Sequence, residues 1–193
     1  MTSAAETVDV PAVPTHGAGA SKLWFWLPIA PLVGLDLWSK AAVFAFLDQR
    51  YPGVGQRVRH SVWDGAVRLD LVRWHNTGTI WGLLQGYNLP LVIVRCVAVV
   101  AIVVYVVRLR RAGAALLLIL GAILAGAAGN LYDNLTEPGG GVRDFLYFTF
   151  FPRSSWQYEF PAFNVADACI SVGVVCLALS ILFEGRKPHV AAS

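Results

Sequence analysis

Four apolar runs, each about twenty residues long, constrain the fold of this chain more than any other feature. They cover residues 23–47, 89–107, 114–135 and 163–183. A helix needs roughly 20 mostly apolar residues to cross the hydrocarbon core of a bilayer. Only 14% of the 193 residues are charged, against about 25% in an ordinary soluble domain. The runs therefore predict an all-α membrane protein, a bundle of four transmembrane helices.

One transmembrane domain, residues 22–187, is expected between two short tails. Residues 1–21 are rich in Ala, Thr, Pro and Gly and have no hydrophobic periodicity, so we expect them to be disordered, and 188–193 form a C-terminal tail. Residues 48–88 alternate apolar and polar side chains in two places, which favours short strands. We expect them to form a small extracytoplasmic β-rich segment that rests at the membrane surface.

Basic residues predict the orientation of the bundle. Arg108, Arg110 and Arg111 form a tight turn between the second and third runs, and the positive-inside rule places that turn in the cytoplasm. With four spans, both termini then also face the cytoplasm. The net charge of +3 is too small to indicate nucleic-acid binding. Membrane lipid is the expected surrounding, and we expect a monomer.

The cysteines and histidines lack the spacing of metal ligands. Neither CxxC nor HExxH occurs in the sequence, and Cys96, Cys169 and Cys176 all lie inside apolar runs. Cysteine packs there as a small hydrophobic residue. We therefore expect no metal ion and no cofactor.

Ionisable residues inside the apolar runs need a partner or a purpose, because each costs roughly 2.5–3.5 kcal/mol on insertion. Asp36 and Lys40 lie four residues apart with the acid first, the order that favours a structural ion pair on one helix face. Arg95, near the start of the second run, is expected to extend toward the interface. Asn130 and Asp133 share one face of the third helix. They form either a hydrogen-bonded clamp between helices or a substrate contact.

Two further aspartates have no evident structural partner. Asp144 follows a loop that contains Pro138 and three consecutive glycines, and an aromatic-rich stretch, expected at the membrane interface, comes after it. Asp167 lies near the start of the fourth run. Asn164, three residues earlier, would be read as the N-cap of that helix, whereas Asp167 has no comparable structural explanation.

Five motifs occur in a fixed order: Asp36-x-x-x-Lys40, Asn76-x-Gly-x-x-Trp-Gly, Gly129-Asn130-x-x-Asp133, Val142-x-Asp144-Phe145 and Phe163-Asn164-x-Ala166-Asp167. In this order, and in their placement relative to the four spans, the chain resembles the lipoprotein signal peptidase (signal peptidase II) family over about residues 24–184. The resemblance implies an intramembrane aspartic endopeptidase of the bacterial cytoplasmic (inner) membrane. It implies cleavage of diacylglyceryl-modified prolipoproteins just before the lipidated cysteine.

The resemblance also implies roles for individual residues. Asp144 and Asp167 would be the catalytic pair, sharing one proton because two close carboxylates cannot both ionise cheaply. Asp36 and Lys40 would form a structural ion pair. Substrate-binding or supporting roles would fall to Asn76, Gly129, Asn130, Asp133 and Asn164. We further expect residues 61–86, with Trp63, Trp74 and Trp81, to act as a lid.

One departure from the family pattern concerns Asn134, which stands where the family usually has an arginine after Asp133. An asparagine cannot mimic the planar donor group of arginine, and Arg143 is a candidate replacement. The loop before Asp144 is also about two residues longer than usual. Two other functions therefore stay open: a catalytically silent lipoprotein-binding homologue, and a proton-coupled membrane carrier, since membrane aspartates also serve in proton relays.

Overall fold

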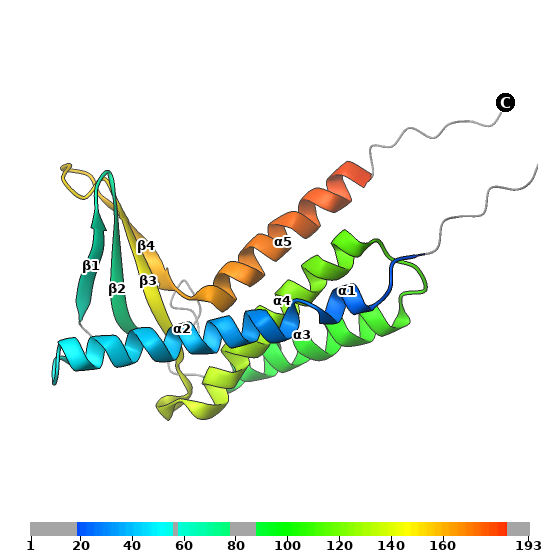
Figure 1. Ribbon diagram of the computed structural model, residues 1–193, viewed down its shortest axis with the longest axis horizontal. Helices are drawn as coiled ribbons and strands as arrows, with labels where there is room; N and C mark the ends of the chain where they lie inside the picture. Colours follow the sequence, from blue (N-terminus) through cyan, green and yellow to red (C-terminus); the bar gives the residue numbers. More distant parts are fainter. Residues whose placement is uncertain (1–18, 56–57, 78–87, 185–193) are drawn as a thin grey trace, which may run out of the picture.

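The computed structural model describes residues 19–55, 58–77 and 88–184. A short helix, α1 (Leu23–Trp26), precedes α2 (Ile29–Arg50), and α3 (Asn88–Arg108), α4 (Ala114–Thr136) and α5 (Val165–Glu184) follow (Figure 1). Within the described residues, four helical stretches are long and apolar enough to cross a membrane. They lie at the four apolar runs of the sequence, as expected for a bundle of four transmembrane helices.

The first predicted span is divided near Pro28. Helix α1 ends at Trp26 and α2 begins at Ile29. Proline has no backbone N–H and its ring crowds the preceding turn, so the helix is interrupted there although the apolar run continues. The chain nevertheless stays close to helical at the break, since the Leu27 N–H donates to the Leu23 carbonyl and the Leu32 N–H donates to the Pro28 carbonyl.

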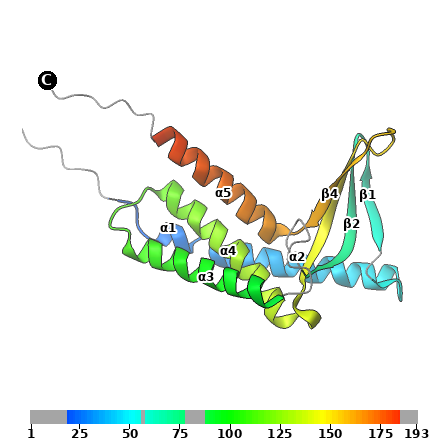
Figure 2. The same cartoon turned by 180° about the vertical axis from the view of Figure 1, so that it is seen from behind.

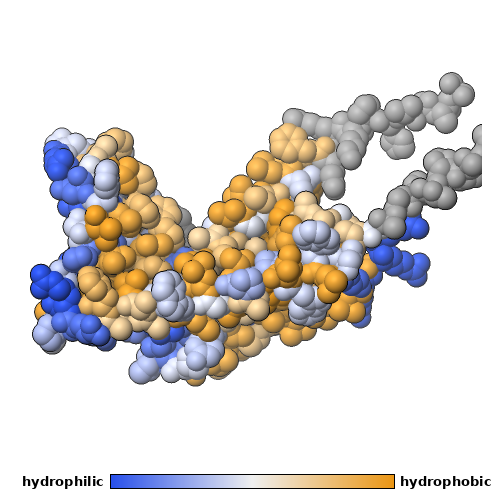
Figure 3. All heavy atoms as spheres, viewed as in Figure 1, coloured by the Kyte–Doolittle hydropathy of each residue, from blue (hydrophilic) through white to orange (hydrophobic). Residues whose placement is uncertain are grey.

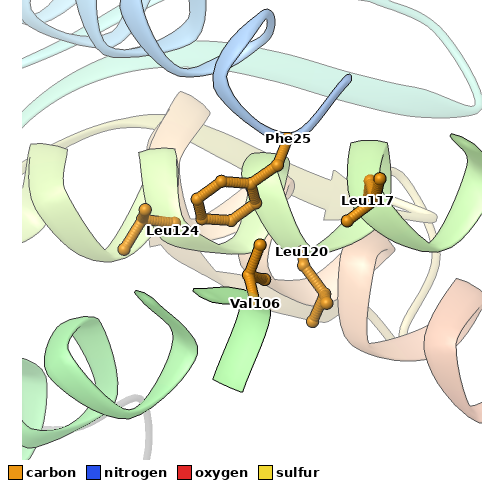
Figure 4. Packing of buried hydrophobic residues seen from close by; sticks show 5 residues of the cluster. All are labelled: Phe25, Val106, Leu117, Leu120 and Leu124. Atoms are coloured by element: carbon orange, nitrogen blue, oxygen red, sulfur yellow. The ribbon is translucent and has the colours of Figure 1, made fainter. Parts of the chain in front are cut away.

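Helix α4 is the central helix of the bundle. In its most apolar window 56% of the residues are buried within the protein, against 11% in α3 and in α5. Phe25 of α1 points between the leucines of α4, with Val106 of α3 beside them (Figure 4). Where hydrocarbon surrounds the helices, such packing stabilises their association by van der Waals contact more than by removing apolar surface from water.

Small residues let other elements approach α4 closely. A side chain added at Gly126 would collide with the carbonyl of Ala166 in α5, and one added at Gly129 would lie 2.5 Å from the Asp36 carboxylate in α2. Both contacts are close helix approaches of the kind that regularly spaced small residues allow. They bring the polar residues of α2, α4 and α5 into one region.

The four strands form one antiparallel sheet in the order β1 (Arg59–Asp64), β2 (Val67–Asn76), β3 (Val142–Phe150) and β4 (Tyr158–Phe163). The predicted strands of residues 48–88 supply only half of it. The aromatic stretch after Asp144, expected merely to lie at the interface, is strand β3. Because β4 continues to Phe163, α5 begins at Val165, and Asn164 alone separates sheet from helix.

The sheet stands at one end of the molecule, and the turn between α3 and α4 lies at the other end (Figures 1 and 2). From the point where β4 meets α5, the sheet and α5 diverge. Hydrophobic residues cover much of the visible face of the helices, while hydrophilic residues gather at the outer edge of the sheet and at the opposite end of the bundle (Figure 3). The polar site described next lies where the two parts meet.

Candidate active site

Strand pairing places Asp144 beside Asn76. Asp144 of β3 lies opposite Trp74 of β2, and Asn76 lies opposite Val142. Asn76 and Asp144 are therefore diagonal neighbours on adjacent strands, close enough for their side chains to meet. The Asn76 side-chain amide donates to the Asp144 carboxylate at 3.1 Å. The Asp144 side chain is almost completely buried, with 1% of it exposed.

Asn164, between β4 and α5, is in contact with both aspartates. Its side-chain nitrogen donates to the Asp144 carboxylate at 2.7 Å. Its side-chain oxygen accepts from the Asp167 backbone N–H at 2.9 Å, and its own backbone N–H donates to the Asp167 carboxylate at 3.2 Å. The last two bonds form a reciprocal cap at the start of α5. The same residue thus begins the helix and orients Asp144 toward Asp167.

Asn130 of α4 holds Asp167 from the other side. Its side-chain nitrogen donates to the Asp167 carboxylate at 2.8 Å. Its side-chain oxygen accepts from the Lys40 ammonium at 3.1 Å and from Asn164 at 3.2 Å. Because a lysine ammonium can only donate, Lys40 fixes the direction of the Asn130 amide. Its NH₂ group is thereby directed at Asp167.

The buried Lys40 neutralises two acids. Its ammonium lies 2.6 Å from the Asp36 carboxylate and 3.1 Å from the Asp133 carboxylate. The second oxygen of Asp36 accepts from the Ala166 backbone N–H at 2.9 Å, so Asp36 also caps the start of α5. The local spacing predicted the pair with Asp36, but it gave no sign of the contacts to Asp133 and Asn130.

Arg143 is bound at the other side of Asp133. Its guanidinium donates to Asp133 at 2.7 Å and 3.2 Å, its backbone N–H donates to the same carboxylate at 3.0 Å, and Glu137 lies 3.2 Å away. His75 lies 3.6 Å from Glu137. This cluster anchors β3 to the end of α4, directly before Asp144.

Arg95 of α3 donates to the side-chain oxygen of Asn134, where the sequence had suggested an extension toward the interface. The Asn134 side-chain nitrogen donates to the Gly140 carbonyl at 2.6 Å. Position 134, where the family usually has an arginine, is an asparagine here, and Arg95 from α3 is bonded to it. A cation in an apolar run was the only sequence signal for this contact.

The surroundings of Asp144 favour its protonated form. Burial, and then the negative charge of Asp167, raise the pKa of the Asp144 carboxyl well above its ordinary value, while the hydrogen bonds from Asn76 and Asn164 act in the opposite direction. Two such carboxyls with different environments can supply a base and an acid to one reaction.

The site thus brings together the candidate residues predicted from the sequence, with Gly129 packed against Asp36 and with Lys40, Asn76, Asn130, Asp133, Asp144, Asn164 and Asp167 joined by the bonds above. Among the described residues no group of three or more His, Cys, Asp and Glu side chains is arranged to hold a metal ion. The lid hypothesis for residues 61–86 stays a prediction. Residues 61–64 and 67–76 are paired strands, with Trp63 and Trp74 on them. Trp81 lies outside the described residues.

Comparison with known proteins identifies the family. The family model described as "Signal peptidase (SPase) II" matches residues 29–183. The chain belongs to the signal peptidase II family. Its lipoprotein signal peptidase relative from Brevibacillus brevis is 31% identical over 165 residues, covering 86% of this chain and 99% of the relative. The relative from Geobacillus thermodenitrificans is 31% identical over 159 residues, covering 82% and 89%.

Solved structures share the fold of this chain. A bacterial membrane enzyme solved at 2.3 Å by the in meso method matches with a TM-score of 0.70 and 21% identity, covering 92% of this chain and all of the other. A second bacterial membrane enzyme, solved at 1.9 Å, matches with a TM-score of 0.53 and 22% identity, covering 77% and 93%. Membership of this peptidase family and the four long apolar helices together indicate that the chain is a peptidase and a multi-pass bacterial membrane protein.

Proposed function

We propose that this protein is an aspartic endopeptidase that removes signal peptides from diacylglyceryl-modified prolipoproteins by cleaving just before the lipidated cysteine. Asp144 and Asp167 are its catalytic pair. The observation that carries the proposal is the bridge of amides between them: Asn164 bonds to both aspartates, and Asn130 bonds to Asp167 and Asn164. Membership of the signal peptidase II family supports the reaction and the substrate.

The chemistry follows from one proton shared by two carboxyls. Asp144 keeps the proton, in line with its raised pKa, and Asp167 is the base. Asp167 takes a proton from a water molecule as that water attacks the carbonyl carbon before the lipidated cysteine. Asp144 donates its proton to the oxygen that gains charge. When the C–N bond breaks, the proton taken up by Asp167 passes to the leaving amine and the hydroxyl proton returns to Asp144.

The surrounding residues have positioning roles in this proposal. Asn76 and Asn164 orient the Asp144 carboxyl, and Asn130 orients Asp167. Asp36 and Lys40 form a buried ionic support that holds α2 against α4 and α5. No bond in the mechanism is made to them. They are expected to matter because a buried charge that loses its partner is costly.

The proposed topology places the reaction on the extracytoplasmic side of the inner membrane. The sheet lies at the end of the bundle opposite the basic α3–α4 turn (Figure 1), and that turn is cytoplasmic by the positive-inside rule. Both termini are then cytoplasmic, and residues 22–187 act as one domain. The enzyme acts as a monomer, and its sheet rests at the membrane surface. The lipid chains of the substrate therefore stay in the bilayer while its peptide reaches Asp144.

The deciding experiment is cleavage of a diacylglyceryl-modified precursor by the purified protein in detergent. The intact chain should release the signal peptide, and Asp144→Asn and Asp167→Asn should each abolish release while folding is retained. Asp64→Asn removes the same charge from an exposed position of the sheet and should cleave normally. Binding of the precursor without cleavage by the intact chain would identify a silent homologue instead. If the intact chain neither binds nor cleaves the precursor, the proton-coupled carrier is the remaining function.

A further inference from the structure

Arg95 is a charged residue in a helix whose composition suits a membrane core. Helix α3 has a mean hydropathy of 2.7 over its most apolar window, and Arg95 lies two turns from its start. Lipid exposure of a guanidinium at that depth is expensive. The side chain instead contacts Asn134 of α4, so it is directed into the bundle.

Asn134 holds the guanidinium of Arg95 in a defined place. Only 8% of the Asn134 side chain is exposed, and its nitrogen is bound to the Gly140 carbonyl at 2.6 Å. That bond leaves the side-chain oxygen as the acceptor for Arg95. Asn134 also follows Asp133, which is tied to Lys40 and Arg143. The arginine is therefore positioned by a residue that is itself rigidly held.

Asn134, which Arg95 contacts, lies one helical turn from Asn130 on α4, and Asn130 donates to the Asp167 carboxylate at 2.8 Å. Arg95 itself forms no ion pair within 4.0 Å with any acid in the described part of the chain. Asp133 already has two cations, and the catalytic carboxyls are bonded to amides. A guanidinium has five N–H donors. Within the described part of the chain, the Arg95 donors that Asn134 does not use form no hydrogen bond, so they can serve a bound peptide.

From this placement we propose that Arg95 is a substrate-positioning residue, which donates hydrogen bonds to a backbone carbonyl of the precursor near the scissile bond. The inference rests on the proposed function. A peptide that enters a water-poor site brings carbonyl oxygens that need donors, and a planar guanidinium suits such acceptors. Arg95 thus supplies from α3 the arginine that the family usually has directly after Asp133.

The test compares steady-state cleavage of a diacylglyceryl-modified precursor peptide by purified variants. Arg95→Gln should raise KM about tenfold or more, the effect of losing a charged hydrogen bond, with kcat changed less than about threefold. The KM of Arg95→Lys should lie between those of the intact chain and Arg95→Gln, because lysine keeps the charge but lacks the planar guanidinium. Arg108→Gln removes the same charge from the exposed far end of α3 and should leave KM unchanged.

The double variant Arg95→Gln with Asn134→Arg separates positioning from a structural role. An arginine at position 134 should restore the KM of the intact chain, at least in large part. An unchanged KM in Arg95→Gln, a loss confined to thermal stability, or no restoration by Asn134→Arg would each overturn the inference. Failure of the intact chain to cut the precursor would overturn the proposed function itself, so the two failures are distinguishable.

Discussion

The Asn164 side chain donates a 2.7 Å hydrogen bond to Asp144 while the same side chain caps the helix that carries Asp167. Two substitutions separate these roles. Asn164→Ser keeps a capping oxygen but loses the amide donor to the protonated Asp144. Stability should therefore stay near that of the intact chain while kcat falls about 2- to 10-fold, the loss of a neutral hydrogen bond. Asn164→Ala should lose a similar amount of kcat and about 1 kcal/mol of stability as well. Equal stability of the two variants in thermal unfolding would argue against the capping role.

The pH profile should respond to Asn76. The proposed mechanism needs the proton on Asp144, so kcat/KM should fall as rising pH removes it. The raised pKa of Asp144 moves that fall to a pH well above the ordinary pKa of an aspartate. The hydrogen bond from Asn76 stabilises the ionised carboxylate and lowers this pKa. Asn76→Ala should therefore move the alkaline fall in kcat/KM to higher pH. Ser61→Ala, on the distant strand β1, should not move it, and a shift to lower pH would contradict the assignment.

Gly129 is expected to tolerate no side chain. A Cβ atom there would lie 2.5 Å from the Asp36 carboxylate, so Gly129→Ala must displace the ion pair with Lys40 or separate α2 from α4. Overpacking of this kind costs about 1–3 kcal/mol, and thermal unfolding in detergent should show it together with reduced cleavage. Gly34→Ala, also in a helix but with no atom within 4 Å of the added carbon, is the matched control. Equal melting temperatures of Gly129→Ala and Gly34→Ala would show that the space beside Gly129 is not tightly filled.

Arg143 should be important for stability. Arg143→Gln leaves Lys40 as the only cation on the fully buried Asp133 and removes the arginine from Glu137, and breaking such a buried pair costs about 3 kcal/mol. Arg153→Gln breaks an ion pair whose two side chains are 72% and 52% exposed, which should cost less than about 1 kcal/mol. Unfolding of both variants in mixed micelles measures the contrast. A loss for Arg143→Gln no larger than that for Arg153→Gln would exclude the anchoring role of the cluster.

Features set by local spacing could be predicted from the sequence. Asp36 and Lys40 lie one helical turn apart, and an asparagine directly before a helical run is a usual N-cap. The lengths of the apolar runs likewise indicated four helices. Each of these inferences needs only neighbouring residues, and each matches a contact or an element of the structure.

Features set by packing between distant segments could not be predicted. Strand β3 has apolar residues at nearly every position from Phe145 to Phe150, so it lacks the alternation by which a strand is recognised. The contact of Arg95 with Asn134 joins two helices whose relative rotation no short pattern encodes. The same holds for Lys40 and Asp133, which are 93 positions apart in the sequence.

The sheet carries Asp144 and α5 carries Asp167, with a single residue between β4 and the helix. Helices in a bilayer that is thinner or thicker than their apolar length adjust by tilting. A tilt of α5 would change its angle to the sheet and hence the separation of the two carboxyls. Catalytic rate should then depend on the acyl-chain length of the surrounding lipid, so that the enzyme works best at the membrane thickness of its own cell.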